Sequence, residues 1–430
     1  MPPISESDLQ RFFQTLKDRP LEPDDPFYEA HLDKNPNDPI KELVRDITYA
    51  DDDSVNLLSG QRGSGKSTEL HRLRRLLETK GYVVFLCDMQ NYINLYFPIE
   101  ITDFLISIML ALNETIREKY GKDFAKRGYG ERLKNFLIET KIRFEGIDFT
   151  GNNGDAPFKF ALQQDPTIKQ RLQNALRGHV TKVVQQAHDF SQDIMKFVRQ
   201  QTDDDQKIVL LIDSVEQIRG VGENAKSVHD SVGNLFSYHS DKLHLKNFHT
   251  VYTVPPYLPP LANLGRFLDS AIIRSIDNVH VFQQDGAPDP NGVTVMENII
   301  QRRFSNWQQI FSHAQLQNMI LATGGDLRDF FRLLKALLVK VPLQGDKPIL
   351  PIKDKVIENA KSDLRRNMLP IPEDDKIWLQ KIATTKQTKL QSIDELPRLA
   401  RFFDNYFVQT HRNGNYWYDI HPLLKDVIAV

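Results

Sequence analysis

The sequence has little cysteine and no long apolar run, and these absences narrow the kinds of protein it can encode. Cys87 is the only cysteine in 430 residues, which excludes disulfides within the chain and cysteine-based metal clusters. No stretch approaches the roughly 18 apolar residues that a membrane-spanning helix needs. The N-terminus lacks the basic patch and apolar core of a secretory signal. We therefore expect a cytoplasmic protein without a membrane anchor.

The chain also lacks a large excess of charge of either sign. Its 55 basic and 57 acidic residues give a formal net charge of −2, so no global attraction to nucleic acid is expected. The 12 histidines are scattered, without a metal-binding spacing such as HExxH. What is present is an ordinary globular composition, 40% hydrophobic and 26% charged, at a length that allows two or three packed units.

Short apolar runs rich in β-branched residues recur at wide spacing. They cover residues 54–59, 82–89, 207–213, 248–254 and 278–282. Nearly continuous apolar runs separated by helical patterns are typical of parallel strands covered on both faces. We therefore expect an α/β core with helices on both sides of the sheet.

Helical patterns and turn signals divide the chain further. Residues 1–50 read as an N-terminal segment with proline- and acid-rich turns, and residues 51–290 as the sheet core. The core carries a helical insertion over about 100–205, in which the turn-rich stretch 144–160 predicts a hairpin or loop. Consecutive helices over 291–370 predict a helical lid.

Residues 371–430 have the pattern of a winged-helix domain. Two helical stretches precede the alternating segments YFVQTH and YWYDIH, which flank RNGN. Such a pair of segments around Asn-Gly is a strong signal for a β-hairpin. Helices followed by a hairpin predict a winged helix, although this fold by itself does not assign a function.

Residues 60–67, GQRGSGKS, match the phosphate-binding pattern GxxxxGK[ST] between a predicted strand and a predicted helix. Glycines let the backbone curl so that its N–H groups converge on phosphate oxygens at the positive end of the helix. Lys66 is expected to reach the β and γ phosphates, and the Ser67 hydroxyl to bind Mg²⁺. We predict ATP or ADP with Mg²⁺ as the cofactor. The expected nucleotide contacts in this loop are Gly60, Gln61, Arg62, Gly63, Ser64, Gly65, Lys66, Ser67 and Thr68.

The run KIVLLIDSVEQI supplies acidic residues for the same site. Asp213 ends a buried strand, where a carboxylate is costly unless it meets a cation, so Mg²⁺ is its expected partner. Glu216 is a candidate for polarising the attacking water, and a surface or helix-capping carboxylate explains it equally well. Lys66, Asp213 and Glu216 are therefore the candidate catalytic residues. Ser214 follows Asp213 directly, at a position where many NTPases with such a phosphate-binding loop carry a second acidic residue.

Three residues from later segments are candidates for nucleotide contacts. Thr253, near a strand end, can sense the γ-phosphate, or it bonds to backbone as strand-end threonines do. Arg328 follows GGD in the first turn of a predicted helix, where a cation is disfavoured without an anion to meet, and its planar fork suits polyphosphate. His421, just before Pro422, can contact a diphosphate. The alternative for His421 is a bond to its own helix end.

In chain order, GQRGSGKST, LLIDSVEQ, TVPPY, GGDLRDF and the C-terminal IHPLL resemble the STAND branch of the P-loop NTPases, which includes NACHT and NB-ARC proteins and is related to AAA+ and origin-recognition ATPases. The resemblance covers roughly residues 25–430. It implies an α/β P-loop NTPase sheet followed by a helical lid and a winged helix. It also implies that His421 contacts bound ADP in an inactive form and that Arg328 acts as the sensor arginine of origin-recognition ATPases.

Two departures from that family argue against rapid hydrolysis. Ser214 replaces the second acid after the strand, and TVPPY lacks the arginine common in NB-ARC proteins. The resemblance then implies a slow ATPase that works as a signalling switch, held by ADP and changed by ATP through a conformational change or homo-oligomerisation. A separately encoded effector or sensor protein is the expected partner, with bacterial antiviral defence as the setting.

The alternative is a DNA-binding AAA+ ATPase of the initiator or transposition-regulator type. Its candidate recognition helix, within residues 392–406, contains only Arg398 and Arg401. Phosphate contacts usually need several cations, so DNA is the less favoured partner. Arg274 and the adjacent Arg302 and Arg303 are candidates for acting on a neighbouring subunit's nucleotide, and ordinary salt bridges explain them as well.

Overall fold

The computed structural model describes most of the chain as two compact units. The described residues are 3–34, 37–121, 132, 135–136, 159, 162–163, 165–202, 206–220, 222–258, 273–345, 347–413 and 415–428. The first unit, here called the loop unit, comprises Met1–Asp38, Gly60–His71 and Ile276–Val430. The second, the sheet unit, comprises Pro39–Ser59 and Arg72–Ser275. The predicted turn-rich stretch 144–160 lies outside the described residues, apart from Lys159.

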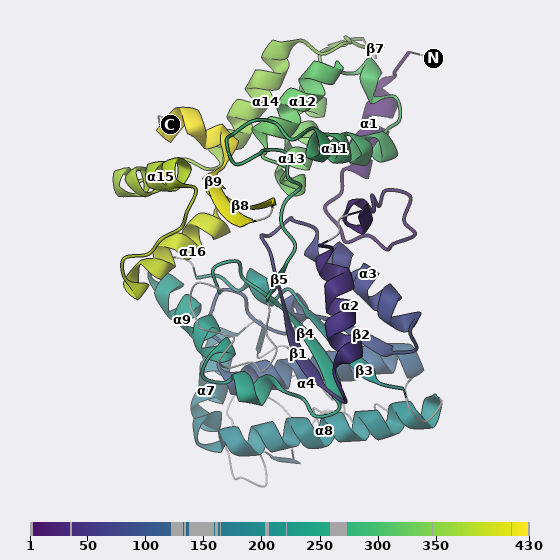
Figure 1. Cartoon of the computed structure of the whole chain (residues 1–430), viewed down its shortest axis with the longest axis vertical. Coiled ribbons are helices and arrows are strands. Elements are labelled where there is room, and N and C mark those ends of the chain that lie inside the picture. Colours follow the sequence, from purple (N-terminus) through teal and green to yellow (C-terminus); the bar gives the residue numbers. More distant parts are fainter. Residues whose placement is uncertain are drawn as a thin grey trace. The chain divides into compact units, whose positions relative to one another are not determined.

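The sheet unit is built on five parallel strands in the order β2-β3-β4-β1-β5. They are β1 (Ser54–Ser59), β2 (Val83–Asp88), β3 (Ile208–Asp213), β4 (Phe248–Val254) and β5 (Arg274–Ser275). β3 and β4 are buried along their whole length, as strands covered on both faces must be. The fold class is α/β with helices flanking a parallel sheet, and four of the five predicted strands are confirmed (Figure 1).

The prediction of a strand at residues 278–282 is wrong. The fifth strand is instead the two-residue β5, which pairs with β1. Val279 and Val281 belong to the hydrophobic core of the loop unit, and the Val279 N–H donates to the Gly325 carbonyl. The apolar run is therefore explained by burial among helices, which periodicity alone does not distinguish from burial in a sheet.

Helices cover the strands of the sheet unit. They are α2 (Pro39–Tyr49), the larger part of α3 (Lys66–Glu78), α4 (Ile101–Tyr120), α7 (Pro166–Leu176), α8 (Val180–Gln201) and α9 (Ala225–Phe236). α4 is apolar on nearly all sides and is buried between β2 and α8, as a helix without a polar face requires. Within the predicted helical insertion, the turn Arg177–His179 separates α7 from α8.

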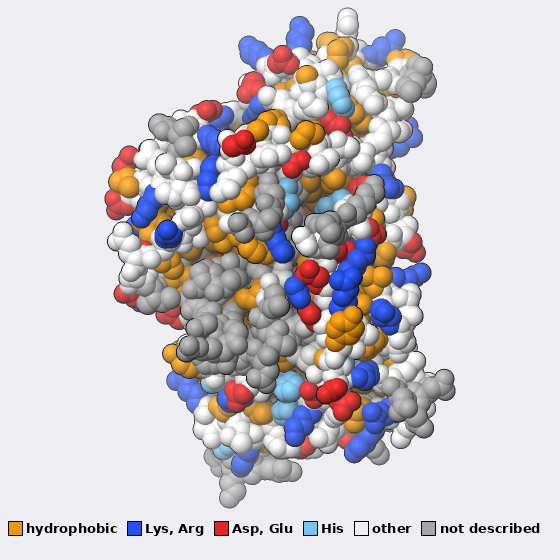
Figure 2. Space-filling model, viewed as in Figure 1, with side chains coloured by type: hydrophobic (Ala, Val, Ile, Leu, Met, Phe, Trp, Pro, Cys, Tyr) orange, Lys and Arg blue, Asp and Glu red, His pale blue; other side chains and the backbone are white. Residues whose placement is uncertain are grey.

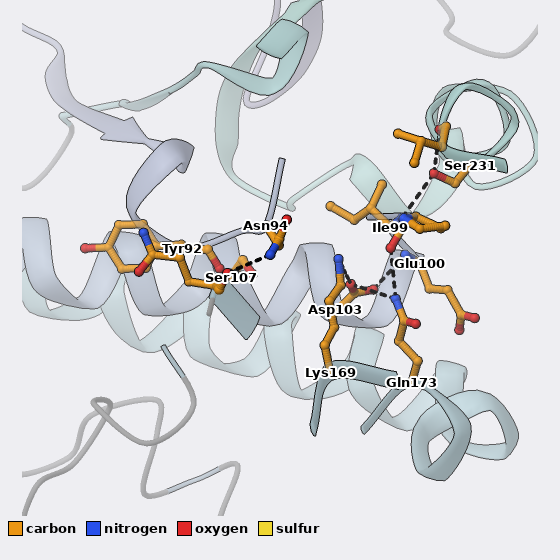
Figure 3. A network of polar contacts seen from close by, with 12 residues as sticks. Tyr92, Asn94, Ile99, Glu100, Asp103, Ser107, Lys169, Gln173 and Ser231 are labelled. Atoms are coloured by element: carbon orange, nitrogen blue, oxygen red, sulfur yellow. Dashed lines mark hydrogen bonds and ion pairs between the residues drawn. The ribbon is translucent and has the colours of Figure 1, made fainter. Parts of the chain in front are cut away.

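A buried polar network joins α7 to the start of α4 (Figure 3). The Asp103 carboxylate accepts hydrogen bonds from the Glu100 N–H at 2.7 Å and from the Gln173 amide at 3.0 Å. The Lys169 ammonium lies 3.4 Å from the same carboxylate, and both side chains are buried. Because buried charges are costly unless paired, this network fixes how the two helices meet.

The loop unit contains a helical layer around one hydrophobic core. Its helices are α1 (Glu6–Thr15), α11 (Pro290–Arg303), α12 (His313–Ala322), α13 (Leu327–Val339) and α14 (Asp354–Arg366), with the small hairpin β6 (Leu343–Gln344) and β7 (Lys347–Pro348). Figure 1 shows α1 beside the later helices. Phe12 stacks on Phe304 at 4.7 Å between ring centroids. The N-terminal segment is thus packed into the core that the 291–370 helices form.

The end of the chain consists of two helices and a hairpin. They are α15 (Glu373–Thr385), α16 (Leu396–Asp404), β8 (Val408–Asn413) and β9 (Asn415–Ile420), followed by a 3-10 turn (Pro422–Leu424) and α17 (Lys425–Ile428). The antiparallel β8–β9 pairing confirms the predicted hairpin. The winged-helix assignment stays a prediction. No described helix combines the length and apolar character needed to cross a membrane.

Candidate functional site

The glycine-rich loop adopts a backbone conformation that only glycine accepts readily. Gly63 and Gly65 have φ values of +85° and +96°, in the left-handed region that disfavours residues with a Cβ. A Cβ on Gly63 would lie 2.8 Å from the Cβ of Arg328, whereas a Cβ on Gly65 would meet no atom within 4 Å. The loop therefore needs glycine for its curl and, at Gly63, for a close neighbour from α13.

Lys66 begins α3, as the motif predicts, and its side chain folds back over the loop. The Nζ atom donates to the carbonyls of Gly60 at 2.8 Å and Gln61 at 2.7 Å. The side chain is buried. The charge of Lys66 is thus fixed beside the loop backbone and the first turn of a helix, where anions are stabilised.

Polar atoms around the loop suit an anion. Ser64 Oγ and Arg62 Nε are buried without a hydrogen-bond partner among the described residues. Buried polar atoms are nearly always satisfied, so a ligand with several oxygens fits this arrangement. Ser67 is partly buried, and the Thr68 hydroxyl accepts a hydrogen bond from the Leu21 N–H at 3.1 Å.

Arg328 stands at the start of α13 for the reasons that the sequence indicates. Gly324 and Gly325 follow α12 with φ values of +62° and +78°. Asp326 is the N-cap of α13, and its Oδ1 accepts from the Asp329 N–H at 2.9 Å. The glycine stop and the aspartate cap are confirmed.

The Arg328 side chain lies against the phosphate loop and has two polar partners. Its Nε is 3.5 Å from the position that a Cβ on Gly63 would take. The same Nε is 2.6 Å from Asp18 Oδ2, and Nη1 donates to the Tyr406 hydroxyl at 3.1 Å. Arg328 therefore joins the loop to the N-terminal segment and to the C-terminal helices.

Gln61 joins the same loop to β8. Its Nε2 donates to the Val408 carbonyl, and its Oε1 accepts from the Thr410 N–H at 3.3 Å and from Asn278 Nδ2 at 3.4 Å. The side chain thus pairs with two backbone groups of the strand. Gln61 was predicted to contact nucleotide, and the structure gives its side chain this second role.

β8 is also attached to the helical layer of the loop unit. Gln409 Nε2 donates to the Thr323 carbonyl at 3.0 Å. A Cβ on Gly324 would lie 2.0 Å from Gln409 Oε1. Gln409, which lies between the two β8 residues that Gln61 contacts, is therefore held by the turn that precedes α13.

His421 is fully buried in the loop unit. Its Nδ1 accepts from the Leu423 N–H at 3.2 Å, and its Nε2 lies 3.5 Å from Asp329 Oδ2. Burial tends to raise the pKa of Asp329, but the nearby His421 and Arg332 outweigh it and lower that pKa. The bond to its own helix end matches the structural alternative for His421, and contact with ADP stays a prediction.

Asp213, Ser214 and Glu216 follow β3 in the sheet unit. Asp213 is 6% exposed, and its Oδ1 accepts from the Ser214 N–H at 2.7 Å. Ser214 has a φ of +70°, and its hydroxyl accepts from Gln90 at 3.1 Å and Gln217 at 3.2 Å. Glu216 is buried, so the reading of it as a surface carboxylate is wrong. Its roles as water-polarising or capping group stay predictions.

Thr253 is engaged at the ends of β3 and β4. Its hydroxyl accepts from the Val215 N–H at 3.1 Å and donates to the Ile212 carbonyl at 3.4 Å. These bonds match the strand-end alternative for Thr253. The sensing of the γ-phosphate by Thr253 stays a prediction.

The three arginines considered for action on a neighbouring subunit all have structural partners. Arg274 contacts Asp46 and Glu42 of α2 at 2.9 and 2.6 Å. Arg302 pairs with Glu29 at 2.5 Å. Arg303 donates to the Thr15 carbonyl at 3.0 Å, and its guanidinium lies 4.5 Å from the Phe331 ring centroid. The salt-bridge explanation fits Arg274 and Arg302, whereas Arg303 is held by a backbone carbonyl and by cation–π stacking.

Sequence reasoning missed Asp18, Tyr406 and Gln409 around the loop. Asp18 lies in a short polar stretch after α1, and Tyr406 has a left-handed backbone with φ of +60° after α16. Neither position belongs to a motif, and the partners of both are more than 70 residues away in sequence. Only tertiary packing reveals them.

Comparison with known proteins gives solved structures alone. No protein-family model matches the chain, and no curated protein matches it significantly. A Walker-type ATPase of Pyrococcus abyssi is similar over 97% of this chain and 100% of that chain, with 13% identity and a TM-score of 0.42. The Aeropyrum pernix ORC2 protein, solved in ADPNP-ADP complexes, is similar over 98% and 97%, with 11% identity and a TM-score of 0.38.

A third structure is the Thermotoga maritima RuvB Holliday junction branch migration motor. It is similar over 97% of this chain and 99% of that chain, with 13% identity and a TM-score of 0.36. Values this low assign no activity to the present chain. The function is therefore inferred from the residues of the chain itself.

Proposed function

We propose that this protein is an ATP-binding switch with slow ATPase activity, of the STAND and AAA+ type. The observation that supports this proposal is the double attachment of the phosphate loop. Arg328 lies against Gly63, and Gln61 hydrogen-bonds to β8. A ligand that fills the loop must act on both neighbours, which is what a switch requires and a simple binding loop does not.

In this proposal the candidate residues have defined tasks. Lys66 and the loop N–H groups bind the phosphates, and Ser67 with Asp213 binds Mg²⁺. The metal, when bound, offsets the charge of the phosphates. Glu216 polarises the attacking water. Ser214 in place of an acid makes hydrolysis slow, so bound nucleotide persists.

The switch depends on different contacts with ADP and with ATP. A ligand shifts an equilibrium between two conformations only by the difference in its affinity for them. Arg328 is the residue that meets the longer polyphosphate, and His421 fixes the C-terminal hairpin in the ADP form. ATP then releases the helical lid and the winged helix, and the changed form oligomerises or acts on a partner effector, as in antiviral defence.

The alternative, a DNA-binding AAA+ ATPase, has weaker support. Arg401 contacts the buried Asp375 at 2.7 Å, and Arg398 lies 3.5 Å from the same carboxylate. Both cations of α16 thus have an internal partner. Figure 2 shows acidic and basic side chains interspersed on the face in view. A salt-sensitive shift of duplex DNA, abolished by Arg398→Glu with Arg401→Glu, would favour this alternative.

The test is to purify the protein, release bound nucleotide by denaturation and identify it by chromatography. We expect wild-type protein to retain ADP, Lys66→Ala to retain none, and His421→Ala to retain less and to form larger assemblies. His313→Ala, at an exposed histidine of α12, is the matched control and should behave as wild type. Fast ATP turnover by isolated wild-type monomers contradicts the switch, and the absence of any nucleotide binding contradicts the proposed function altogether.

A further inference from the structure

Asp18 places a negative charge beside Arg328, the arginine to which the proposed function assigns the contact with nucleotide. We propose that Asp18 is an internal competitor of the polyphosphate for Arg328, so that the N-terminal segment restrains nucleotide binding until an anion displaces it. This inference rests on the proposed function and adds a regulatory contact to the same site.

The geometry brings the two candidate anions of Arg328 to one place. Asp18 Oδ2 lies 2.6 Å from Arg328 Nε, and the same nitrogen is 3.5 Å from the position of a Cβ on Gly63. A guanidinium attracts a carboxylate oxygen and a phosphate oxygen alike, because both carry negative charge. An anion that binds in the loop therefore meets an arginine whose charge Asp18 already compensates.

The Asp18 contact is built to be displaced. Its side chain is 53% exposed, whereas the Arg328 side chain is 21% exposed. Among the described residues, Arg328 is the only cation paired with Asp18. Exposed ion pairs are weak and screened by salt. A nucleotide with several charges, bound at the same time by the loop, outcompetes a single exposed carboxylate.

The chain around Asp18 limits how far it can move. Asp18 lies between Leu16, which follows α1 and is in the core of the loop unit, and Leu21, whose N–H donates to Thr68 Oγ1. The carboxylate is thus tethered on both sides within a few residues. Such a tether keeps the competitor near Arg328 when the contact opens, so the restraint is reversible.

Tyr406 shares Arg328 without competing for its charge. Its hydroxyl accepts a hydrogen bond from Nη1 at 3.1 Å. A neutral hydroxyl does not compensate a guanidinium, so it orients the group and leaves its charge available. Asp18 is therefore expected to weaken nucleotide binding as a competitor, whereas Tyr406 acts as a positioning residue for Arg328.

The experiment compares ATP binding by calorimetry in wild-type protein, Asp18→Asn and Asp24→Asn. Asp24 is an exposed acid of the same segment, so its variant has the same change in net charge. Since an exposed ion pair shifts an equilibrium by about two- to five-fold, we expect Asp18→Asn to bind ATP about two- to five-fold more tightly, and Asp24→Asn to match wild type. The gain should shrink as salt is raised, because screening weakens the contact.

A second background makes the inference specific to Arg328. In Arg328→Gln, adding Asp18→Asn should leave ATP affinity unchanged. Equal or weaker ATP binding by Asp18→Asn, with wild type binding normally, overturns the competition and leaves the proposed function intact. A wild-type protein that binds neither ATP nor ADP overturns the proposed function itself, so the two failures are distinguishable. Thermal unfolding of each variant establishes that the folded proteins are being compared.

Discussion

Replacing Gln61 with methionine tests whether the hydrogen bonds of the Gln61 side chain to β8 stabilise the loop unit. The Gln61 side chain is 3% exposed, and methionine keeps its length and volume while removing both of its polar groups. The variant therefore deletes the hydrogen bonds to Val408 and Thr410 and leaves the packing in place. Any loss of stability then reports the bonds and not a cavity.

The magnitude follows from the groups left without partners. The Val408 carbonyl and the Thr410 N–H are on a strand whose residues there are buried. An unsatisfied buried polar group costs about 1–3 kcal/mol, so two such groups predict a loss of about 2–4 kcal/mol after some relaxation. The long bond to Asn278 adds little.

The three tryptophans make the assay selective. Trp307, Trp378 and Trp417 all belong to the loop unit, so their fluorescence during urea unfolding reports that unit. Gln10→Met, at an exposed glutamine of α1, is the control and should change stability by less than about 0.5 kcal/mol, as surface substitutions do. If Gln61→Met is no less stable than Gln10→Met, the reasoning about β8 is refuted.

Two further predictions concern buried charges. Burial, together with the charge of Asp329, raises the pKa of Asp326 to about 7. A raised carboxyl pKa makes wild-type protein lose stability as pH rises from about 5 to 7, whereas asparagine does not titrate. The free energy of unfolding of Asp326→Asn, measured by tryptophan fluorescence, should therefore rise by about 2 kcal/mol relative to wild type over that range. A difference that stays constant with pH would contradict this prediction. Lys169→Met should destabilise the sheet unit by about 3–5 kcal/mol, because it leaves Asp103 buried without its cation, whereas Asp103→Leu with Lys169→Met should recover most of the loss. Circular dichroism during urea unfolding measures both, and equal stability of single and double variants would refute the pairing.

The features that the sequence predicted correctly depend on neighbours in the chain. The run 54–59 is β1 to the residue, because a short apolar run between turn signals is typical of a buried strand. Gly324, Gly325 and Asp326 end one helix and begin the next through bonds within four residues. The hairpin of β8 and β9 is local in the same sense.

The features that the sequence did not reveal depend on distant partners. Val279 and Val281 have the composition of a strand, but which core buries them is decided by segments tens of residues away. Gln61 was assigned from a motif that describes phosphate contacts, and nothing in that motif indicates its bonds to β8, nearly 350 residues later. Asp18 and Arg328 also lie far apart in the sequence. Periodicity predicts elements, while such pairings follow from packing.

Two distinct physical reasons favour glycine at the glycine positions of the phosphate loop. Gly65 has a left-handed backbone with open space around it, so its requirement for glycine is conformational. Gly60 and Gly63 would each place a Cβ against another segment, Gly60 at 2.3 Å from the Ile276 carbonyl oxygen and Gly63 at 2.8 Å from Arg328. At these two positions glycine also admits the elements that, in the proposed switch, a bound nucleotide would move. If the proposed function holds, the same few residues would serve both phosphate binding and its coupling to the rest of the loop unit.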